Sequence, residues 1–261
     1  MINKTLLAVA IIGSSSGLSA AEFNGAEFTL GYSRLSEGGY SLNTNDLGAS
    51  GSLSFGETFV LDGGIAYSRV GSGSDDLDLT VLSLSGDYTG FENATAGAFL
   101  DVSRLSGDGG SYGIYHYGVQ GSYNVQNVVF SGYLGRGDSS DMGLKSTVGG
   151  VTANYAFANG LDIGAYFDRE YIDDIFGLSD YGVSFGYDLS ANTPVPAYLN
   201  ASFGRYELDG YPRDQMRLSL TVPLGREASK GRKPLHGHST FSTVIGSLMG
   251  ALTMDPPPPP P

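Results

Sequence analysis

The chain has 261 residues, a formal net charge of −13 and no cysteine. Charged residues make up 16% of the chain, well below the roughly 25% of soluble domains, and its 40 glycines are about double the usual share. The missing cysteines exclude disulfides and cysteine-based zinc sites. The acidic balance argues against a nucleic-acid partner, and the hydrophobic share of 41% argues against disorder. No apolar run reaches the roughly 18 residues of a membrane-spanning helix.

The N-terminus has the layout of a secretory signal peptide. Lys4 precedes an apolar run at 6–12, and the small residues Ser19 and Ala21 occupy the −3 and −1 positions of a cleavage site. We therefore expect cleavage before Glu22 and export of the mature chain.

After this segment, apolar residues recur with a period of two, which is typical of β-strands. In the first such stretch, Phe28, Leu30 and Tyr32 alternate with small or polar residues. The pattern predicts twelve strands, at about 26–35, 46–55, 58–70, 76–88, 93–105, 112–124, 127–137, 143–157, 160–171, 179–189, 196–206 and 213–225.

The connections between these stretches alternate between short turns and longer acidic loops, with one longer exception among the turns at 189–195. Gly56-Glu57 is one of the turns, and 36–45 is one of the longer loops. Strands joined in this way form an antiparallel meander, and an even number lets the first and last strands pair and remove the sheet edges. In 76–88 the apolar parity changes between Val81 and Leu82, which predicts a β-bulge.

Alternation alone leaves open which face of the sheet lies outside, because a soluble sandwich buries its apolar row. Three features favour lipid. The polar row consists mostly of Gly, Ser, Thr and Ala, the connections alternate in length, and aromatic residues such as Phe55, Tyr155 and Phe167 gather near strand ends. The sequence therefore predicts an all-β fold, a transmembrane antiparallel up-and-down β-barrel of 12 strands. The expected parts are a signal peptide (1–21), the barrel (22–225) and a periplasmic C-terminal extension (226–261).

The signal peptide, the glycine-rich alternating strands and the repeated Gly-x-x-Tyr-like hairpins resemble a Gram-negative outer-membrane β-barrel of the porin-like kind over 22–225. The resemblance implies a location in the cell outer membrane and passive diffusion of small hydrophilic solutes. Porin-like chains usually end at the last strand with an aromatic residue. Here the last strand ends at Gly225, and 36 further residues follow.

An arginine recurs near the end of every second predicted strand, at spacings of 35, 35, 32, 33 and 36 residues, about one hairpin each. These arginines share the parity of the apolar row, so they should point outward on the side of the longer loops. That is where an outer membrane presents lipopolysaccharide phosphates, which suit a guanidinium fork. The alternative is that rim arginines reach the interface without binding a specific lipid. The predicted lipopolysaccharide belt consists of Arg34, Arg69, Arg104, Arg136, Arg169 and Arg205.

Small inward residues would leave room for water and small solutes in a barrel with a backbone radius of roughly 12 Å. Charged groups on the wall set pore selectivity, and the acidic balance predicts a mild cation preference if the lumen is open. The alternative is that these charges pair across the wall. The predicted pore-lining residues are Asp62, Asp101, Asp162, Asp168, His116 and Arg217, with Glu170 on the same parity.

The sequence gives no support for an enzyme, a cofactor or a metal site. His116 is the one histidine of the barrel region, and the residue two positions later is Gly118, so there is no His-x-Ser pair. There is no glycine-rich phosphate loop, His-Glu-x-x-His motif or Gly-x-Ser-x-Gly motif, and the acidic loops lack the spacing of a calcium loop. His236 and His238 lie in the extension and are weak metal candidates.

The extension differs in charge from the barrel. Four basic residues fall within 226–233, apolar residues follow at helical spacing from Phe241 to Leu252, and six prolines end the chain. A plug entering the lumen, a helix on the inner leaflet and a tether to a periplasmic partner are the three uses considered, besides a mostly disordered tail. The alternative to a channel is therefore a non-transporting barrel that acts as an envelope anchor or interaction module through this extension.

Overall fold

The computed structural model describes residues 21–225 and His238, apart from 38–39, 72–76, 108–109, 140, 174–175, 191–192, 194–195 and 209. The predicted signal peptide up to residue 20 and the extension other than His238 lie outside the described residues. The first strand begins at Ala21, one residue before the predicted start of the mature chain.

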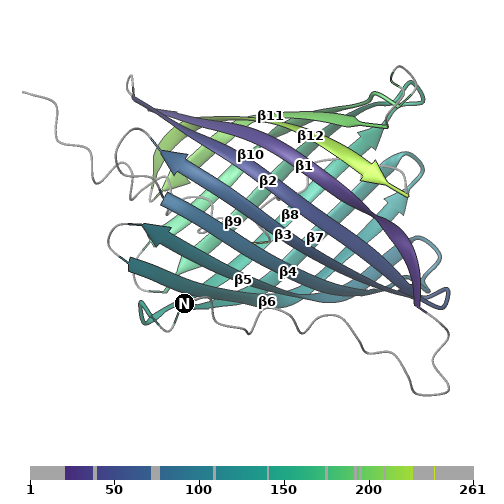
Figure 1. Ribbon diagram of the computed structural model, residues 1–261, viewed down its shortest axis with the longest axis horizontal. Coiled ribbons are helices and arrows are strands. Elements are labelled where there is room, and N and C mark those ends of the chain that lie inside the picture. Colours follow the sequence, from purple (N-terminus) through teal and green to yellow (C-terminus); the bar gives the residue numbers. More distant parts are fainter. Residues whose placement is uncertain are drawn as a thin grey trace, which may run out of the picture.

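Twelve strands form one closed barrel, in which each strand pairs antiparallel with the next and β1 pairs with β12 (Figure 1). The predicted all-β barrel of twelve antiparallel strands is confirmed. In the described part of the chain, no helix is long and apolar enough to cross a membrane. The strands are β1 (Ala21–Glu37), β2 (Tyr40–Phe55), β3 (Phe59–Gly71), β4 (Leu77–Tyr88), β5 (Ala94–Gly107), β6 (Gly110–Val125), β7 (Val128–Ser139), β8 (Leu144–Ala156), β9 (Leu161–Ile172), β10 (Phe176–Asp188), β11 (Tyr198–Leu208) and β12 (Tyr211–Leu224).

Large apolar side chains cover the outside of this barrel. Leu30 and Leu134 are 59% and 60% exposed, whereas Glu27, three positions from Leu30 and on the opposite parity, is buried at 2%. The apolar row therefore faces outward and the polar row inward, as expected for a wall in contact with lipid.

The two ends of the barrel are named here for the predicted connections. The turn end holds the connections 56–58, 89–93, 126–127, 157–160 and 189–197, together with Ala21 and Leu224, and the loop end is the opposite one.

The predicted alternation of short turns and long loops is wrong. A loop was expected over 36–45, but β1 and β2 pair as far as Glu37 and Tyr40, which leaves only 38–39 between them. The longest connection, 189–197, lies at the turn end, at the exception that the sequence indicated. Main-chain pairing does not require apolar side chains, so the strands continue into the polar, acidic segments that the sequence pattern assigned to loops.

The predicted bulge in β4 is also wrong. Over its described length, β4 pairs with β3 and β5 without a shift of register. Leu79 and Val81 point into the barrel and are buried, whereas Leu82 and Leu84 point outward and are exposed. The parity changes because this strand carries apolar residues on both faces. A register shift occurs instead in β1, between Phe23 and Gly25.

Candidate functional site in the barrel interior

Apolar side chains fill the loop-end part of the interior. They come from inward positions near the strand ends, and Ile172, Leu178 and Tyr206 are almost completely buried. This packing excludes water at that level. We call this set the apolar layer; it comprises Leu35, Leu42, Val70, Ile114, Ile172, Leu178 and Tyr206, with Leu77, Met142, Leu144 and Leu208 packed against it, and the adjoining Leu79, Val81 and Leu105.

A layer of buried polar groups contains two of the predicted pore-lining residues. Glu170, fully buried, accepts a hydrogen bond from Ser146 Oγ at 2.6 Å and pairs with His116 Nε2 at 2.8 Å. Arg217 donates to Asp180 at 2.9 Å. His116 and Arg217 are therefore held by carboxylates from other strands, as in the alternative of charges that pair across the wall.

The arrangement around Glu170 differs from a catalytic triad. In a triad the histidine lies between the nucleophile and the acid, so that it can take the nucleophile's proton. Here the carboxylate of Glu170 lies between Ser146 and His116. The three side chains form a buried network in which the serine donates to the carboxylate, while the other imidazole nitrogen, His116 Nδ1, is buried without a hydrogen-bond partner among the described residues.

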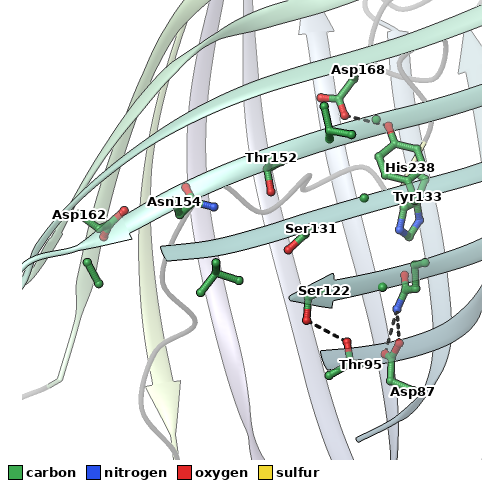
Figure 2. Close-up of a pocket in the computed structure, with 17 residues that line it drawn as sticks. Asp87, Thr95, Ser122, Ser131, Tyr133, Thr152, Asn154, Asp162, Asp168 and His238 are labelled. Atoms are coloured by element: carbon green, nitrogen blue, oxygen red, sulfur yellow. Dashed lines mark hydrogen bonds between the residues drawn. The ribbon is translucent and has the colours of Figure 1, made fainter. Parts of the chain in front are cut away.

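Elsewhere in the interior, the described residues line two cavities whose walls carry small polar side chains and carboxylates. Figure 2 shows the first, of about 430 Å³, and the second has a volume of about 540 Å³. Asp87, Gln120 and His238 line both. The first cavity is also lined by Thr95, Ser122, Ser131, Thr152, Asn154, Asp162 and Asp168, and the second by Glu27, Thr29, Ser50, Ser52, Asp62, Ser83 and Asp101, among others.

All six predicted pore-lining residues lie on the inner wall, but only four reach the cavities. Asp162 and Asp168 line the first cavity and Asp62 and Asp101 the second, whereas His116 and Arg217 line neither. The sequence analysis missed Asp87, at the end of β4, because the mixed parity of that strand hid its direction.

Neutral groups supply several of the hydrogen bonds to these carboxylates. Gln120 donates to both oxygens of Asp87 at 2.9 Å, and Tyr133 donates to Asp168 at 2.9 Å (Figure 2). Tyr198 donates to Asp162. Amide and phenol donors orient a carboxylate without supplying a counter-charge.

The six predicted belt arginines are all exposed on the outside, near the loop end. Followed in chain order through the paired residues, each arginine lies two residues closer to the turn end than the one before, and four residues closer at the step from Arg104 to Arg136. This offset compensates for the tilt of the strands, so the arginines form a level ring. Four of them contact neighbours: Arg69 with Asp78, Arg205 with Asp214, Arg136 with Thr147, and Arg104 with Ser111.

No protein-family model matches the chain, and no curated protein matches its sequence. Solved structures share its fold. The NanC porin matches with a TM-score of 0.54 at 9% identity, over 76% of this chain and 98% of that one. An outer-membrane channel from Pseudomonas putida F1 matches with a TM-score of 0.53 at 12% identity, over 81% and 100%. The translocator domain of the autotransporter NalP from Neisseria meningitidis matches with a TM-score of 0.52 at 10% identity, over 76% and 88%. At these identities the likeness concerns the fold, which is that of porin-like outer-membrane β-barrels.

Proposed function

We propose that this protein is a porin-like channel of the outer membrane that passes small hydrophilic solutes with a preference for cations. The observation that carries the proposal is the pair of interior cavities, whose walls carry Asp62, Asp87, Asp162 and Asp168. The fold shared with an outer-membrane channel and a porin supports it.

Cation preference follows from the balance of charge on the cavity walls. A low-dielectric wall concentrates the field of its charges in the lumen, so carboxylates there attract cations and repel anions. Arg217 does little to offset them, because it lies outside both cavities and pairs with Asp180.

The apolar layer is the section of highest resistance in this proposal. A solute that enters from the turn end reaches the cavities first and then the packed side chains around Leu178 and Ile172. Hydrophobic constrictions oppose ion passage by excluding water. We therefore expect small conductance steps, well below those of a barrel with an open lumen.

The test is the reversal potential of single channels in planar bilayers under a KCl gradient. The sign should indicate cation preference, and the double variant Asp62→Asn, Asp168→Asn should move the potential toward zero. Asp138→Asn, at an exposed position on β7 near the loop end, is the matched control and should leave the potential unchanged. Anion preference, or equal shifts in the control and double variants, would contradict the proposal.

The apolar layer also favours a second function, a non-transporting barrel that serves as an envelope anchor or interaction module. A barrel closed by packed side chains needs no conducting path. Silence in planar bilayers, both for the natural chain and for Leu178→Ala, would favour this function over a channel.

We also propose that the level ring of arginines binds lipopolysaccharide phosphates. Replacing all six arginines with Gln should reduce the lipopolysaccharide that copurifies with the barrel. Replacing them with Lys keeps the charge but removes the planar fork. Recovery with Lys would indicate attraction by charge alone, and unchanged copurification in the Gln variant would contradict a lipopolysaccharide site.

A further inference from the structure

We propose that Asp101, Phe99 and Tyr133 form a binding site inside the barrel for an imidazole-bearing peptide segment, and that His238 of this chain's own C-terminal extension occupies it. His238 lies 137 positions after Asp101 and contacts all three residues. Figure 2 shows His238 beside Tyr133 on the wall of the first cavity.

Asp101 supplies the polar part of the site. Its Oδ2 accepts a hydrogen bond from the backbone N–H of His238 at 2.8 Å. The same oxygen lies 2.8 Å from the ring nitrogen His238 Nδ1. Asp101 is completely buried. A buried carboxylate without donors is costly, so the two contacts give the site a preference for a histidine with its own amide.

Phe99 and Tyr133 supply the aromatic part. The imidazole stacks on Phe99, with ring centroids 3.8 Å apart and an interplanar angle of 23°, and it meets Tyr133 edge to face at 4.7 Å. Tyr133 is fixed in turn by its hydrogen bond to Asp168. Two sides of the imidazole therefore contact rings that the barrel holds in place.

The wall behind Phe99 leaves room for its ring. Phe99 points into the barrel from β5 and is buried, whereas most other inward residues of this strand are small or polar. A Cβ at Gly118 or Gly135 would come within 2.8 Å of its ring atoms. These two glycines of β6 and β7 let Phe99 lie against the wall, so the site is built from three adjacent strands.

Chain length and charge both allow His238 to be the occupant. His238 lies thirteen positions after Gly225, the first residue after β12, and such a segment spans at most roughly 45 Å. Four basic residues lie in 226–233, ahead of His238, and the cavity walls carry carboxylates. Opposite charges favour entry of the extension into the lumen.

Occupation of the site has a consequence that rests on the proposed channel function. His238 lines both cavities, so it lies between them on the path of a solute. Full-length channels should therefore conduct less than a variant whose histidine cannot bind.

The binding itself is tested by disulfide formation in the full-length chain, which has no native cysteine. The pair Asp101→Cys, His238→Cys should oxidise to an intramolecular disulfide, since the carboxylate contacts the main chain of His238. The control pair Leu100→Cys, His238→Cys places the first cysteine one residue away, on the outer face of the same strand, and should remain reduced. No disulfide in the first pair, or equal yields in both, would overturn the proposal.

A second measurement separates the binding site from the channel function. His238→Ala and Asp101→Asn should each raise single-channel conductance about two-fold, whereas His236→Ala, in the same extension, should not. An equal increase with His236→Ala would overturn the role of His238. A disulfide formed without any conducting channel would keep the site and contradict the proposed function.

Discussion

The two parts of the barrel interior are built from the same twelve strands, yet they are filled differently. Toward the loop end, large inward residues such as Leu178, Ile172 and Tyr206 meet in a packed layer. Elsewhere, inward positions carry Ser, Thr, Asn and Gly, and cavities remain. The strand pattern sets the wall of a barrel, but the size of the inward side chains decides whether its lumen is open at a given level.

The two parts also treat charge differently. Glu170 is fully buried with His116, whereas Asp87 is held by the neutral amide of Gln120 beside a cavity. Buried charges are stable only when they are paired or hydrogen-bonded. In the proposed channel, carboxylates beside the cavities need no counter-charge of their own and remain available to cations.

The largest effect on stability is expected when the buried acid Glu170 is removed. Glu170→Ala leaves His116 and Ser146 without their shared partner, and it should lower the free energy of unfolding by about 3–5 kcal/mol. The measurement is urea-induced unfolding of the barrel in lipid vesicles. Asp78→Ala removes the acid of the exposed pair with Arg69 and should change stability little. Equal losses would contradict the contrast between the interior and the outer face.

Thinning the apolar layer should affect both stability and conductance. Leu178→Ala creates a cavity at a fully buried position and should cost about 3 kcal/mol. It should also raise single-channel conductance, because the narrowest level becomes wider and wetter. Leu134→Ala, on the outer face, should leave conductance unchanged. If Leu178→Ala conducts like the natural protein, the apolar layer is not the main resistance.

A smaller loss is expected from overfilling the polar network. A Cβ at Gly137 would lie 2.6 Å from His116 Nε2 and closer still to Ser146 Oγ. Gly137→Ala should therefore cost about 1–3 kcal/mol in the same unfolding measurement. At Gly63 the one atom within 4 Å of an added Cβ is Ser83 O, at 4.0 Å, so Gly63→Ala provides the control. A neutral Gly137→Ala would indicate that this network is looser than its distances imply.

The smallest effect on stability is expected where the interior has free volume. Ser131 lines the first cavity, so Ser131→Leu should fit without a measurable loss of stability. The larger side chain should nevertheless lower conductance by narrowing the path. A large loss of stability would show that this part is packed as tightly as the apolar layer.

The sequence predicted the strands because apolar residues recur with a period of two. It predicted their orientation because the alternate row consists mostly of small and polar residues and aromatic residues gather near the strand ends. The predicted strand ends were wrong at the loop end, where β1 and β2 continue through polar residues. Main-chain pairing forms there regardless of whether the side chains are polar or apolar. Leu79 and Val81 are apolar at inward positions because they belong to the apolar layer, but the sequence analysis interpreted the change of parity after them as a β-bulge. Nothing near His238 in the sequence indicated its partner, because Asp101 lies 137 positions earlier and the two residues meet only in the folded chain.

The central claim is that the outer stripes meet lipid, the cavities hold water and the apolar layer is dry. Because the chain has no cysteine, single cysteines at Leu134, Ser131 and Leu178 can report these three environments in vesicles through their rates of labelling by a water-soluble maleimide. We expect fast labelling at position 131 and little at positions 134 and 178. Fast labelling at position 134, or slow labelling at position 131, would contradict the assignment of the two faces.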